Sequence, residues 1–541
     1  MPRIGLEPEE RDIVLNTVRD LGRDIITPEH TLAWDREGAL PREVMQTLLG
    51  PDVGLHLLFL PEPCGGAGGG ARDLCAVSEA LSRLDLGLAT TMLGVALGCD
   101  PLRVGGTEEQ QRRWLGQVAD RGLLVAYGVT EPEAGSDVAS LRTRAEPVRD
   151  GDRVVAYRLD GVKQFITNGS VADLYTVLAR APGGPSFFVV QRGTPGLGAG
   201  SAESKHGIRC SDTAQVVLDG VEVPADQLVG LEEGRGLAQA NQVFGHTRLM
   251  VAAMALGAGR EAMGRAVAHA GERTQFGKPL CELRGYVGKL LLPHLLRLEA
   301  AGAYIGQTAA RLDAGEAGLQ TEGAVAKLHA TEAASRAADA AVQALGGYGY
   351  IREYLVEKIR RDVRVTTIYE GTSEVMQNLI FVFRLRQVVR GKSFYREMAQ
   401  GYEGPAPELL SRCAETLDQL VLTMHRLKVG RRQDVRFQLA DRMVELEHAL
   451  ALGRASVGAG RAMKAGCRVL AARTAASLAT TAARLLAASE LRDEELALRC
   501  RELAVDELLA TRHGSPVDVD LAAAWALERA VRAGTAARSS D

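Results

Sequence analysis

Two short segments of this 541-residue chain combine side chains that could bind a cofactor or move a proton. The first, residues 127–137, reads YGVTEPEAGSD and follows an apolar run. A turn rich in Thr, Ser and Gly can present backbone N–H groups and hydroxyls to a phosphate or to the edge of a heteroaromatic ring. A purely structural turn, shaped by Pro132 and Gly135, would explain the same residues.

The second segment, residues 361–378, reads RDVRVTTIYEGTSEVMQN and places Glu370 between Tyr369 and Gly371. Partial burial beside the Ile and Tyr that precede it would raise the pKa of the Glu370 carboxyl and suit it to general-base work. Gly371 would let a ligand approach the backbone closely. These features predict a site for proton abstraction.

A structural interpretation of the second segment is also open. Thr372 could cap the N-terminus of a following helix through its hydroxyl. Glu370 and Glu374 could then complement the dipole of that helix and have no catalytic role.

The elements that would position these segments follow from the hydrophobic pattern. Apolar residues recur at helical spacing over 1–122, whereas 123–228 contains short runs of Val, Phe, Tyr and Ile cut by turn pairs such as Asp-Gly and Asn-Gly. Helical periodicity returns over 229–390. Residues 391–408 are predicted as a linker, and 409–541 as a further helical unit. We therefore expect a mainly α fold with a central antiparallel β-domain of six to eight strands.

Composition excludes several classes of function. The net charge is −4 with scattered Lys and Arg, so nucleic acid is not an expected partner. The eight cysteines stand singly with no metal-ligand spacing, and no metal is expected. The N-terminus MPRIGLEPEERD has no signal or transit character, so we expect a cytoplasmic protein of bacterial type.

Six blocks in a fixed order resemble the acyl-CoA dehydrogenase family. They are YGVTEPEAGSD (127–137), QFITNG (164–169), KHGIRCSDT (205–213), ERTQFGKPL (272–280), QALGGYGYIREYLVEKIRRD (343–362) and IYEGTSEV (368–375). The resemblance covers roughly residues 7–390. It implies a helical domain, a β-barrel domain and a helical bundle.

The resemblance also implies a reaction, the FAD-dependent oxidation of an acyl-CoA thioester to its trans-2-enoyl form, in fatty-acid β-oxidation or related acyl-CoA metabolism. Glu370 would take the α-proton while the β-hydrogen leaves as hydride to flavin N5. The backbone N–H of Glu370 and a ribityl hydroxyl of the flavin would bond the thioester carbonyl, which is oxyanion-type stabilisation. Some members carry the base on an earlier helix, but this chain has Thr247 there.

Further roles are implied by position in the family's blocks. The expected FAD contacts are Tyr127, Val129, Thr130, Gly135, Ser136, Phe165, Ile166, Thr167, Arg273, Gln275, Phe276, Gln343, Gly346, Gly347, Thr372 and Glu374. The residues of blocks 272–280 and 343–362 would reach the FAD of a neighbouring subunit. The expected substrate contacts are Ser136, Arg248, Tyr369 and Gly371. Phe165 stands where the family usually has Trp, which keeps an apolar face but loses the indole N–H.

The C-terminal extension suggests a subtype. Residues 429–456 resemble the extra helical domain of very-long-chain acyl-CoA dehydrogenases, which implies a homodimer. An electron-transfer flavoprotein is the electron acceptor that the family implies. Residues 466–489 could lie on a membrane, but they lack aromatic anchors, so packing within the domain is the favoured interpretation.

Two alternative functions stay open. An acyl-CoA oxidase would pass electrons to oxygen, and a family member without catalysis would serve as an assembly or binding protein. The intact Glu370 favours catalysis.

Overall fold

The computed structural model describes residues 5–489, 491–510 and 513–536, and the chain forms two compact units. The first unit extends to Ala258 and includes Ala309–Gln320. The second contains Gly259–Thr308 and the chain from Thr321 onward. Helices α8 (Gly236–Glu272) and α10 (Leu292–Asp313) each contribute to both units.

The first unit begins with helices, as the apolar periodicity predicted. They include α1 (Pro8–Asp24), α2 (Pro28–Glu37), α3 (Arg42–Leu49), α4 (Ala71–Leu84), α5 (Leu86–Gly105) and α7 (Gly116–Arg121). Helix α5 is capped by Asp85, whose carboxylate accepts the Leu88 N–H at 3.0 Å. It is buried on every side from Leu86 to Leu102, so it forms the centre of this unit. The glycine-rich stretch 65–70 is a connection before α4.

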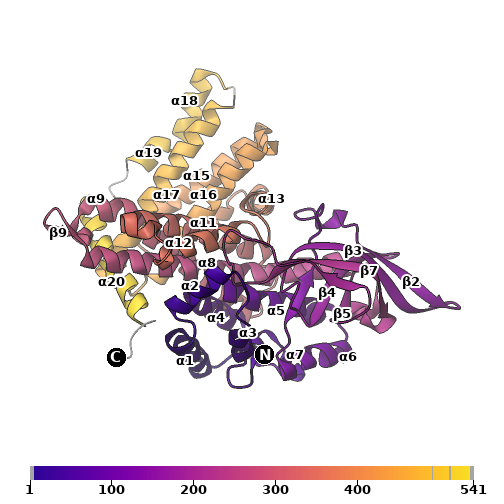
Figure 1. Cartoon of the computed structure of the whole chain (residues 1–541). Helices are drawn as coiled ribbons and strands as arrows, with labels where there is room; N and C mark the ends of the chain where they lie inside the picture. The colour runs from indigo at the N-terminus through magenta and orange to yellow at the C-terminus, as the bar shows by residue number, and fades with distance from the viewer. Residues whose placement is uncertain (1–4, 490, 511–512, 537–541) are drawn as a thin grey trace. The chain divides into compact units, whose positions relative to one another are not determined.

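A seven-stranded sheet follows in the same unit (Figure 1). The strands are β1 (Val125–Gly128), β2 (Arg144–Asp150), β3 (Arg153–Thr167), β4 (Leu174–Ala181), β5 (Gly184–Gln191), β6 (Leu197–Ala199) and β7 (Thr213–Pro224). Their order is β1-β4-β2-β3-β7-β6, with β5 paired to β4. Most pairs are antiparallel, as expected, but β4 runs parallel to β1 and, at one residue pair, to β2. The predicted fold class, mainly α with a central β-domain, is confirmed.

Among the residues that the structure describes, the second unit contains helices and one short hairpin, formed by the two-residue strands β8 (Thr274–Gln275) and β9 (Lys278–Pro279). Its helices include α11 (Gln320–Leu345), α12 (Leu355–Val363), α13 (Ser373–Gly391), α14 (Phe394–Ala399), α15 (Pro407–Arg426), α16 (Gln433–Ala455), α17 (Arg461–Ala487), α18 (Asp493–Glu502), α19 (Val505–Leu509) and α20 (Pro516–Ala536). The segment predicted as a linker contains α14, where Tyr395 is fully buried and its N–H donates to Asp418. This stretch is therefore packed rather than extended.

The C-terminal helices pack on one another and on α13. Helix α17 contacts α16 and α20, and it buries Cys467, Leu470 and Leu478 among them. Residues 466–489 thus lie mostly within a packed helix, in line with the favoured interpretation. Among the residues that the structure describes, no helix is both long and apolar enough to cross a bilayer.

Candidate active site

The turn 128–137 of the first unit is fixed by a buried ion pair. Lys163 Nζ lies 2.6 Å from Glu131 Oε1 and 3.3 Å from the carbonyl oxygen of Val129, and the Lys163 side chain is fully buried. The second carboxylate oxygen of Glu131 accepts the N–H of Arg142 at 2.6 Å. The pair therefore ties β3 to the first half of the turn and, through Arg142, to the segment that follows it.

The ion pair perturbs the titration of both partners. Burial lowers the pKa of Lys163 to about 8, although Glu131 opposes that shift. Burial alone would raise the pKa of Glu131, but hydrogen bonds from Lys163, Thr143 and Arg142 together bring it below its ordinary value. The carboxylate is thus ionised at neutral pH, as the pairing requires.

A bulge in β3 presents Phe165. The register of β3 on β7 shifts between Lys163 and Ile166, and Phe165 takes a left-handed backbone with φ of 57°. Its ring is 64% exposed, whereas the Ile166 side chain lies in the core of the β-domain. An exposed apolar ring on a residue with a strained backbone indicates that a ligand covers this surface.

Several other predicted flavin contacts lie on the same part of the first unit. Tyr127 and Thr130 are half-buried, and Gly135 and Ser136 are exposed on the turn. Val129 is buried, so, like Ile166, it offers a ligand its backbone rather than its side chain. The N–H of Gln164 donates to Thr130 at 2.9 Å and joins the turn to the bulge.

Helix α5 supports this surface from beneath. The buried Asn168 amide donates to the carbonyl oxygens of Thr91 on α5, at 3.1 Å, and of Val125 on β1, at 3.0 Å. Gly94 and Gly98 of α5 face Thr167 and Val125, where a Cβ would meet those side chains at 2.8 and 2.4 Å. The absence of side chains at these glycines lets the helix pack directly on the candidate flavin segments.

Glu370 occupies a strained loop in the second unit. Its φ is 55° and that of Gly371 is 95°, so two successive residues adopt the left-handed region before α13 begins. Such a conformation costs of order 1–3 kcal/mol for a residue with a side chain and persists only where the surroundings hold it. Glu370 and Tyr369 are partly exposed and Ile368 is half exposed, so the environment is less apolar than the sequence suggested.

Three contacts hold the loop. The fully buried Lys327 of α11 donates from Nζ to the carbonyl oxygen of Gly371 at 2.6 Å. Thr372 accepts the Val375 N–H at 3.3 Å, so its predicted capping role is confirmed. Ser373 Oγ lies 2.7 Å from Glu332 Oε1. Together these bonds fix the backbone on the C-terminal side of Glu370.

Glu374 lies in the first turn of α13 and is exposed. The pKa of its carboxyl is lowered, first by its own backbone N–H and then by the Thr372 hydroxyl. It therefore carries a negative charge at the N-terminus of the helix, as its structural interpretation predicted.

Two protruding segments of the second unit carry the remaining predicted FAD contacts. Arg273, Gln275 and Phe276 lie on the β8–β9 hairpin, and Phe276 is 93% exposed with a φ of 53°. The second segment contains Gln343, Gly346 and Gly347, all exposed. An edge contact between His269, in the last turn of α8, and Tyr348, with ring centroids 6.0 Å apart, joins the helix before the hairpin to the second segment.

Arg248 lies on α8 in the first unit and is partly buried, with its guanidinium over the Phe244 ring at 5.4 Å. Thr247, at the alternative position of the base, is buried, and its hydroxyl donates to the Val243 carbonyl oxygen at 3.2 Å. It cannot act as a carboxylate base. The family resemblance gives two positions for the base, 247 and 370, and only Glu370 carries a carboxyl group.

Comparison with known proteins decides the family. Residues 8–121, 126–221 and 234–382 match the N-terminal, middle and C-terminal domains of acyl-CoA dehydrogenases, respectively. The chain is 38% identical to a cyclohexane-1-carbonyl-CoA dehydrogenase of Geobacter metallireducens, over 69% of this chain and 96% of that one. The chain belongs to the acyl-CoA dehydrogenase family. It is an oxidoreductase whose cofactor is FAD, as the sequence blocks predicted.

Solved structures share the fold of this acyl-CoA dehydrogenase. The butyryl-CoA dehydrogenase of Megasphaera elsdenii matches with a TM-score of 0.66 at 34% identity, over 70% of this chain and 99% of that one. An acyl-CoA dehydrogenase of Bacillus anthracis, solved with FAD, matches with a TM-score of 0.85 at 24% identity, over 97% of both chains. The second match extends the shared fold over the C-terminal helices.

Two residues with clear structural roles were missed in the sequence. Lys163 stands at an inward position of β3, in phase with the buried Leu159, and Lys327 lies on the apolar stripe of α11 between Ala324 and Thr331. A lysine on a buried face is rare unless it is paired. A lysine at a position that the apolar pattern predicts to be buried is therefore the signal by which both residues could be found.

Proposed function

We propose that this enzyme oxidises an acyl-CoA thioester to the trans-2-enoyl-CoA with Glu370 as the base that removes the α-proton. The observation that carries the proposal is the strained loop. Glu370 and Gly371 both have a left-handed backbone, the Glu370 side chain is partly exposed, and Lys327 holds the Gly371 carbonyl. Strain of this kind collects at sites whose geometry is needed for chemistry. No step of this assignment depends on the length of the acyl group.

The residues of the first unit fit a flavin. The exposed Phe165 ring can cover one face of an isoalloxazine, and the turn 128–137 offers backbone groups and the Thr130 hydroxyl to its edge. FAD, when bound, supplies the hydride acceptor for the β-hydrogen. Lys163 and Glu131 hold this surface in place without needing to touch the cofactor.

Around the thioester, the chain itself has two tasks. Glu370 receives the α-proton on its carboxylate, and its backbone N–H donates to the thioester carbonyl as negative charge develops there. Arg248, Tyr369 and Ser136 are the side chains we assign to substrate contact, and Gly371 gives the acyl group room beside the backbone. The bond from Lys327 to the Gly371 carbonyl fixes the backbone that carries both the Glu370 carboxylate and its N–H.

The protruding aromatic segments support a homodimer. Phe276 and Tyr350 are 93% and 83% exposed, and apolar rings displayed to this extent indicate contact with another chain. We assign Arg273, Gln275, Gln343, Gly346 and Gly347 to the FAD of the partner subunit. An electron-transfer flavoprotein is the acceptor we propose for the electrons, and cytoplasm is the compartment.

Product analysis tests the proposed reaction. Purified holoenzyme is incubated with a straight-chain acyl-CoA and an artificial electron acceptor in the absence of oxygen, and the thioester products are separated. We expect the trans-2-enoyl-CoA in amounts equal to the acceptor reduced. Reduction of acceptor without enoyl product, or FAD-containing enzyme that reduces no acceptor with any acyl-CoA, would reject the proposal.

A further inference from the structure

The second unit contains a small cavity lined by α10, α11 and α16, so it lies where the C-terminal extension faces two of the helices that precede it. Its volume is about 80 Å³. One buried water needs about 10–15 Å³ of such space, so a small polyatomic ion or several waters fit inside. Its charged and polar lining residues are Arg297, His329, Glu332, Arg336, Asp441, Arg442 and Glu445. A protein interior seldom contains so many ionisable side chains unless they bind one another or a ligand.

Two carboxylates of this cavity are bonded to α13. Glu332 accepts a hydrogen bond from Ser373 Oγ at 2.7 Å. Asp441 accepts one from Gln377 Nε2, also at 2.7 Å. These two acids therefore hold the start of α13, and part of their hydrogen-bonding capacity is already used.

Two of the three arginines of the cavity have few partners within the protein. Arg297 is half-buried and donates no side-chain hydrogen bond to any residue that the structure describes. The ion pair of Arg336 with Glu332 is long, at 3.6 Å, and the Arg336 side chain is 55% exposed. Arg442 is better bonded, with Glu445 Oε1 2.9 Å from its Nη2. A guanidinium has five N–H donors, so Arg297 and Arg336 can bind further acceptor atoms.

Positive charge accumulates around Arg297. Burial lowers the pKa of its guanidinium, and three other arginines lower it further, while Glu445 opposes them. These arginines are Arg336, Arg442 and Arg473. Burial and the neighbouring arginines, Arg297 first among them, also lower the pKa of His294, one turn earlier on α10, to about 4. An anion placed beside Arg297 would relieve this repulsion.

Buried polar atoms without a hydrogen-bond partner also gather at this cavity. Among the residues that the structure describes, Arg442 Nε and Glu445 Oε2 are two such atoms on the wall. Two more lie beside it, namely His294 Nδ1 and the Nε2 of His448, whose ring stacks on His329 with centroids 3.8 Å apart. In native proteins such atoms are normally bonded to a ligand or to ordered water. The cavity thus presents both donors and an acceptor to whatever it binds.

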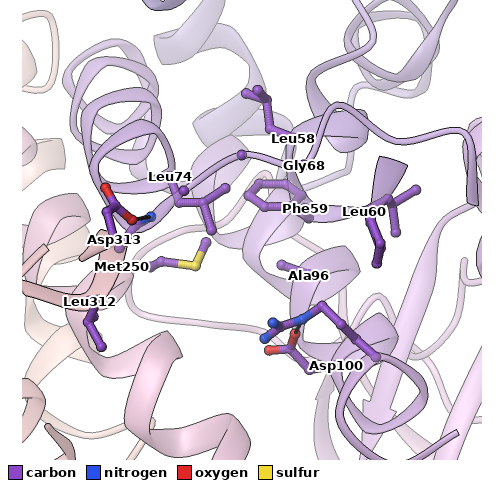
Figure 2. Close-up of a pocket in the computed structure, with 15 residues that line it drawn as sticks. Leu58, Phe59, Leu60, Gly68, Leu74, Ala96, Asp100, Met250, Leu312 and Asp313 are labelled. Carbon is purple, nitrogen blue, oxygen red and sulfur yellow. Dashed lines mark hydrogen bonds and ion pairs between the residues drawn. The ribbon is translucent and has the colours of Figure 1, made fainter. Parts of the chain in front are cut away.

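A larger cavity in the first unit, of about 330 Å³, shows the opposite pattern (Figure 2). Most of its wall is apolar. Arg103 Nε lies 2.7 Å from Asp100 Oδ1, and Asp313 accepts two backbone N–H groups at the start of α4. Its charged groups are thus bonded within the protein, whereas Arg297 in the smaller cavity is not.

We propose that the cavity between α10, α11 and α16 binds a phosphate group, either free phosphate or the phosphate of a small monoester, through Arg297, Arg336 and Arg442. The forked N–H groups of a guanidinium match the oxygens of phosphate, and several guanidinium groups can surround one tetrahedral ion. At neutral pH a phosphate can still carry a proton, so one of its oxygens can donate to Glu445 Oε2. Sulfate carries no proton at this pH and would be repelled by the same carboxylate.

The bound ion would connect separate parts of the second unit. Arg297 and Arg336 belong to α10 and α11, whereas Arg442 belongs to α16 of the extension. A phosphate that contacts all three therefore joins the extension to the helices before it, and it should raise the unfolding temperature by mass action. Because Arg336 is exposed, the substituent of a monoester can extend past it into solvent.

Equilibrium dialysis of the FAD-loaded enzyme against radiolabelled inorganic phosphate tests the assignment. FAD is kept bound so that the protein groups that contact its phosphates are already filled, and chloride sets the ionic strength. We expect saturable binding of one phosphate per chain. A hydrogen bond to a charged group typically contributes enough for about a tenfold effect or more, so sulfate should compete at least about tenfold less well.

Substitutions of single arginines locate the bound phosphate. Arg297→Met should raise the dissociation constant for phosphate at least about tenfold, and Arg297→Lys should retain part of the affinity. Arg426→Met, which removes an exposed arginine of α15 outside the cavity wall, is the matched control and should bind phosphate as the wild type does. The absorbance of bound FAD shows that each variant is folded.

Glu445→Gln tests the discrimination between the two anions. The variant keeps the shape of the side chain and removes the charge that repels sulfate, so sulfate should bind more tightly than to the wild type. A gain of binding cannot result from partial unfolding. Unchanged sulfate affinity in Glu445→Gln, or equal affinity of the wild type for sulfate and phosphate, would contradict the role given to Glu445.

The remaining outcomes decide the site and the source of the phosphate. If the wild type shows no saturable phosphate binding above the chloride background, the cavity holds only water and the proposal is overturned. Binding that Arg297→Met retains in full places the phosphate elsewhere and overturns it as well. Phosphoethanolamine that displaces inorganic phosphate at lower concentration than inorganic phosphate itself identifies a monoester as the ligand, and the reverse order identifies free phosphate.

Discussion

Arg384 of α13 and Glu447 of α16 form an ion pair, with Nη2 and Oε2 2.8 Å apart and both side chains 1% exposed. The hydroxyl of Tyr304 also donates to Glu447, at 2.8 Å. The pair therefore joins the helix that starts beside Glu370 to the C-terminal extension, all within the second unit. Two further side-chain bonds run along the same helices, from Gln377 to Asp441 and from Arg436 to Asn378.

Replacing one member of this pair should be costly. Glu447→Ala leaves the Arg384 guanidinium buried with less compensation, and breaking a buried pair in this way costs about 3–5 kcal/mol of unfolding free energy. Urea unfolding measures the loss. Asp434→Ala removes a carboxylate from the exposed pair with Arg432 and should cost far less, because water screens both charges. Equal losses in the two variants would contradict the role given to the buried pair.

The pair beneath the flavin turn gives a prediction with a pH dependence. Lys163→Met leaves Glu131 buried without its cation and should weaken both FAD binding and folding at neutral pH. In the wild type, the lowered pKa of Glu131 contributes stability above about pH 4.5 that is lost as the pH falls further. In the variant, burial without the cation favours the protonated carboxyl. The difference between wild type and Lys163→Met should therefore be largest at neutral pH and shrink below about pH 4.5.

A second substitution serves as the control for that effect. Glu131→Gln, added to Lys163→Met, removes the unpaired charge and should restore part of the lost stability, because the two residues form one network. Thermal unfolding of the four proteins completes the cycle. Additive losses would show that the two side chains act independently.

Lys327 should affect the rate of chemistry more than the binding of substrate. Lys327→Met removes the bond to the Gly371 carbonyl and frees the strained loop, so flavin reduction should slow while FAD stays bound. Stopped-flow absorbance gives the rate. Lys358→Met is the matched control, because Lys358 is also buried but pairs with Asp362 in its own helix. If both variants slow reduction equally, general destabilisation and not loop geometry is the cause.

Phe165 should contribute to FAD affinity without supporting the fold. Because its ring is largely exposed, Phe165→Ala should leave the unfolding temperature of the apoprotein unchanged. Loss of an aromatic contact of about 0.5–1.5 kcal/mol, together with the apolar area that the ring covers, should weaken FAD binding by about tenfold. Phe165→Trp should bind FAD at least as tightly as the wild type. Fluorescence titration of the apoprotein with FAD checks both.

Some of this organisation follows directly from the sequence. The turn pairs and alternating runs of 123–228 predicted the β-domain, and Thr372 was identified as a helix cap because its hydroxyl needs only local backbone partners. The parallel pairing of β1 with β4 was not predictable, since strand order depends on contacts between distant segments. The same is true of Lys163 and Lys327, whose partners lie 32 and 44 residues away in the sequence. Residues 394–399 have too few apolar positions to predict a helix, because α14 is stabilised by its packing on α13 and α15.

The rate of flavin reduction in Glu370→Gln tests the central claim most directly. Wild type, Glu370→Gln and Glu408→Gln, each loaded with FAD, are mixed anaerobically with a straight-chain acyl-CoA, and the visible absorbance of the flavin is followed. General-base catalysis typically contributes about 10²–10⁴-fold, so Glu370→Gln should reduce its flavin at least about a hundredfold more slowly than the wild type. Glu408→Gln, which changes an exposed carboxylate in the first turn of α15, should react at nearly the wild-type rate. Flavin reduction at the wild-type rate in Glu370→Gln would show that another group removes the α-proton and would contradict the assignment.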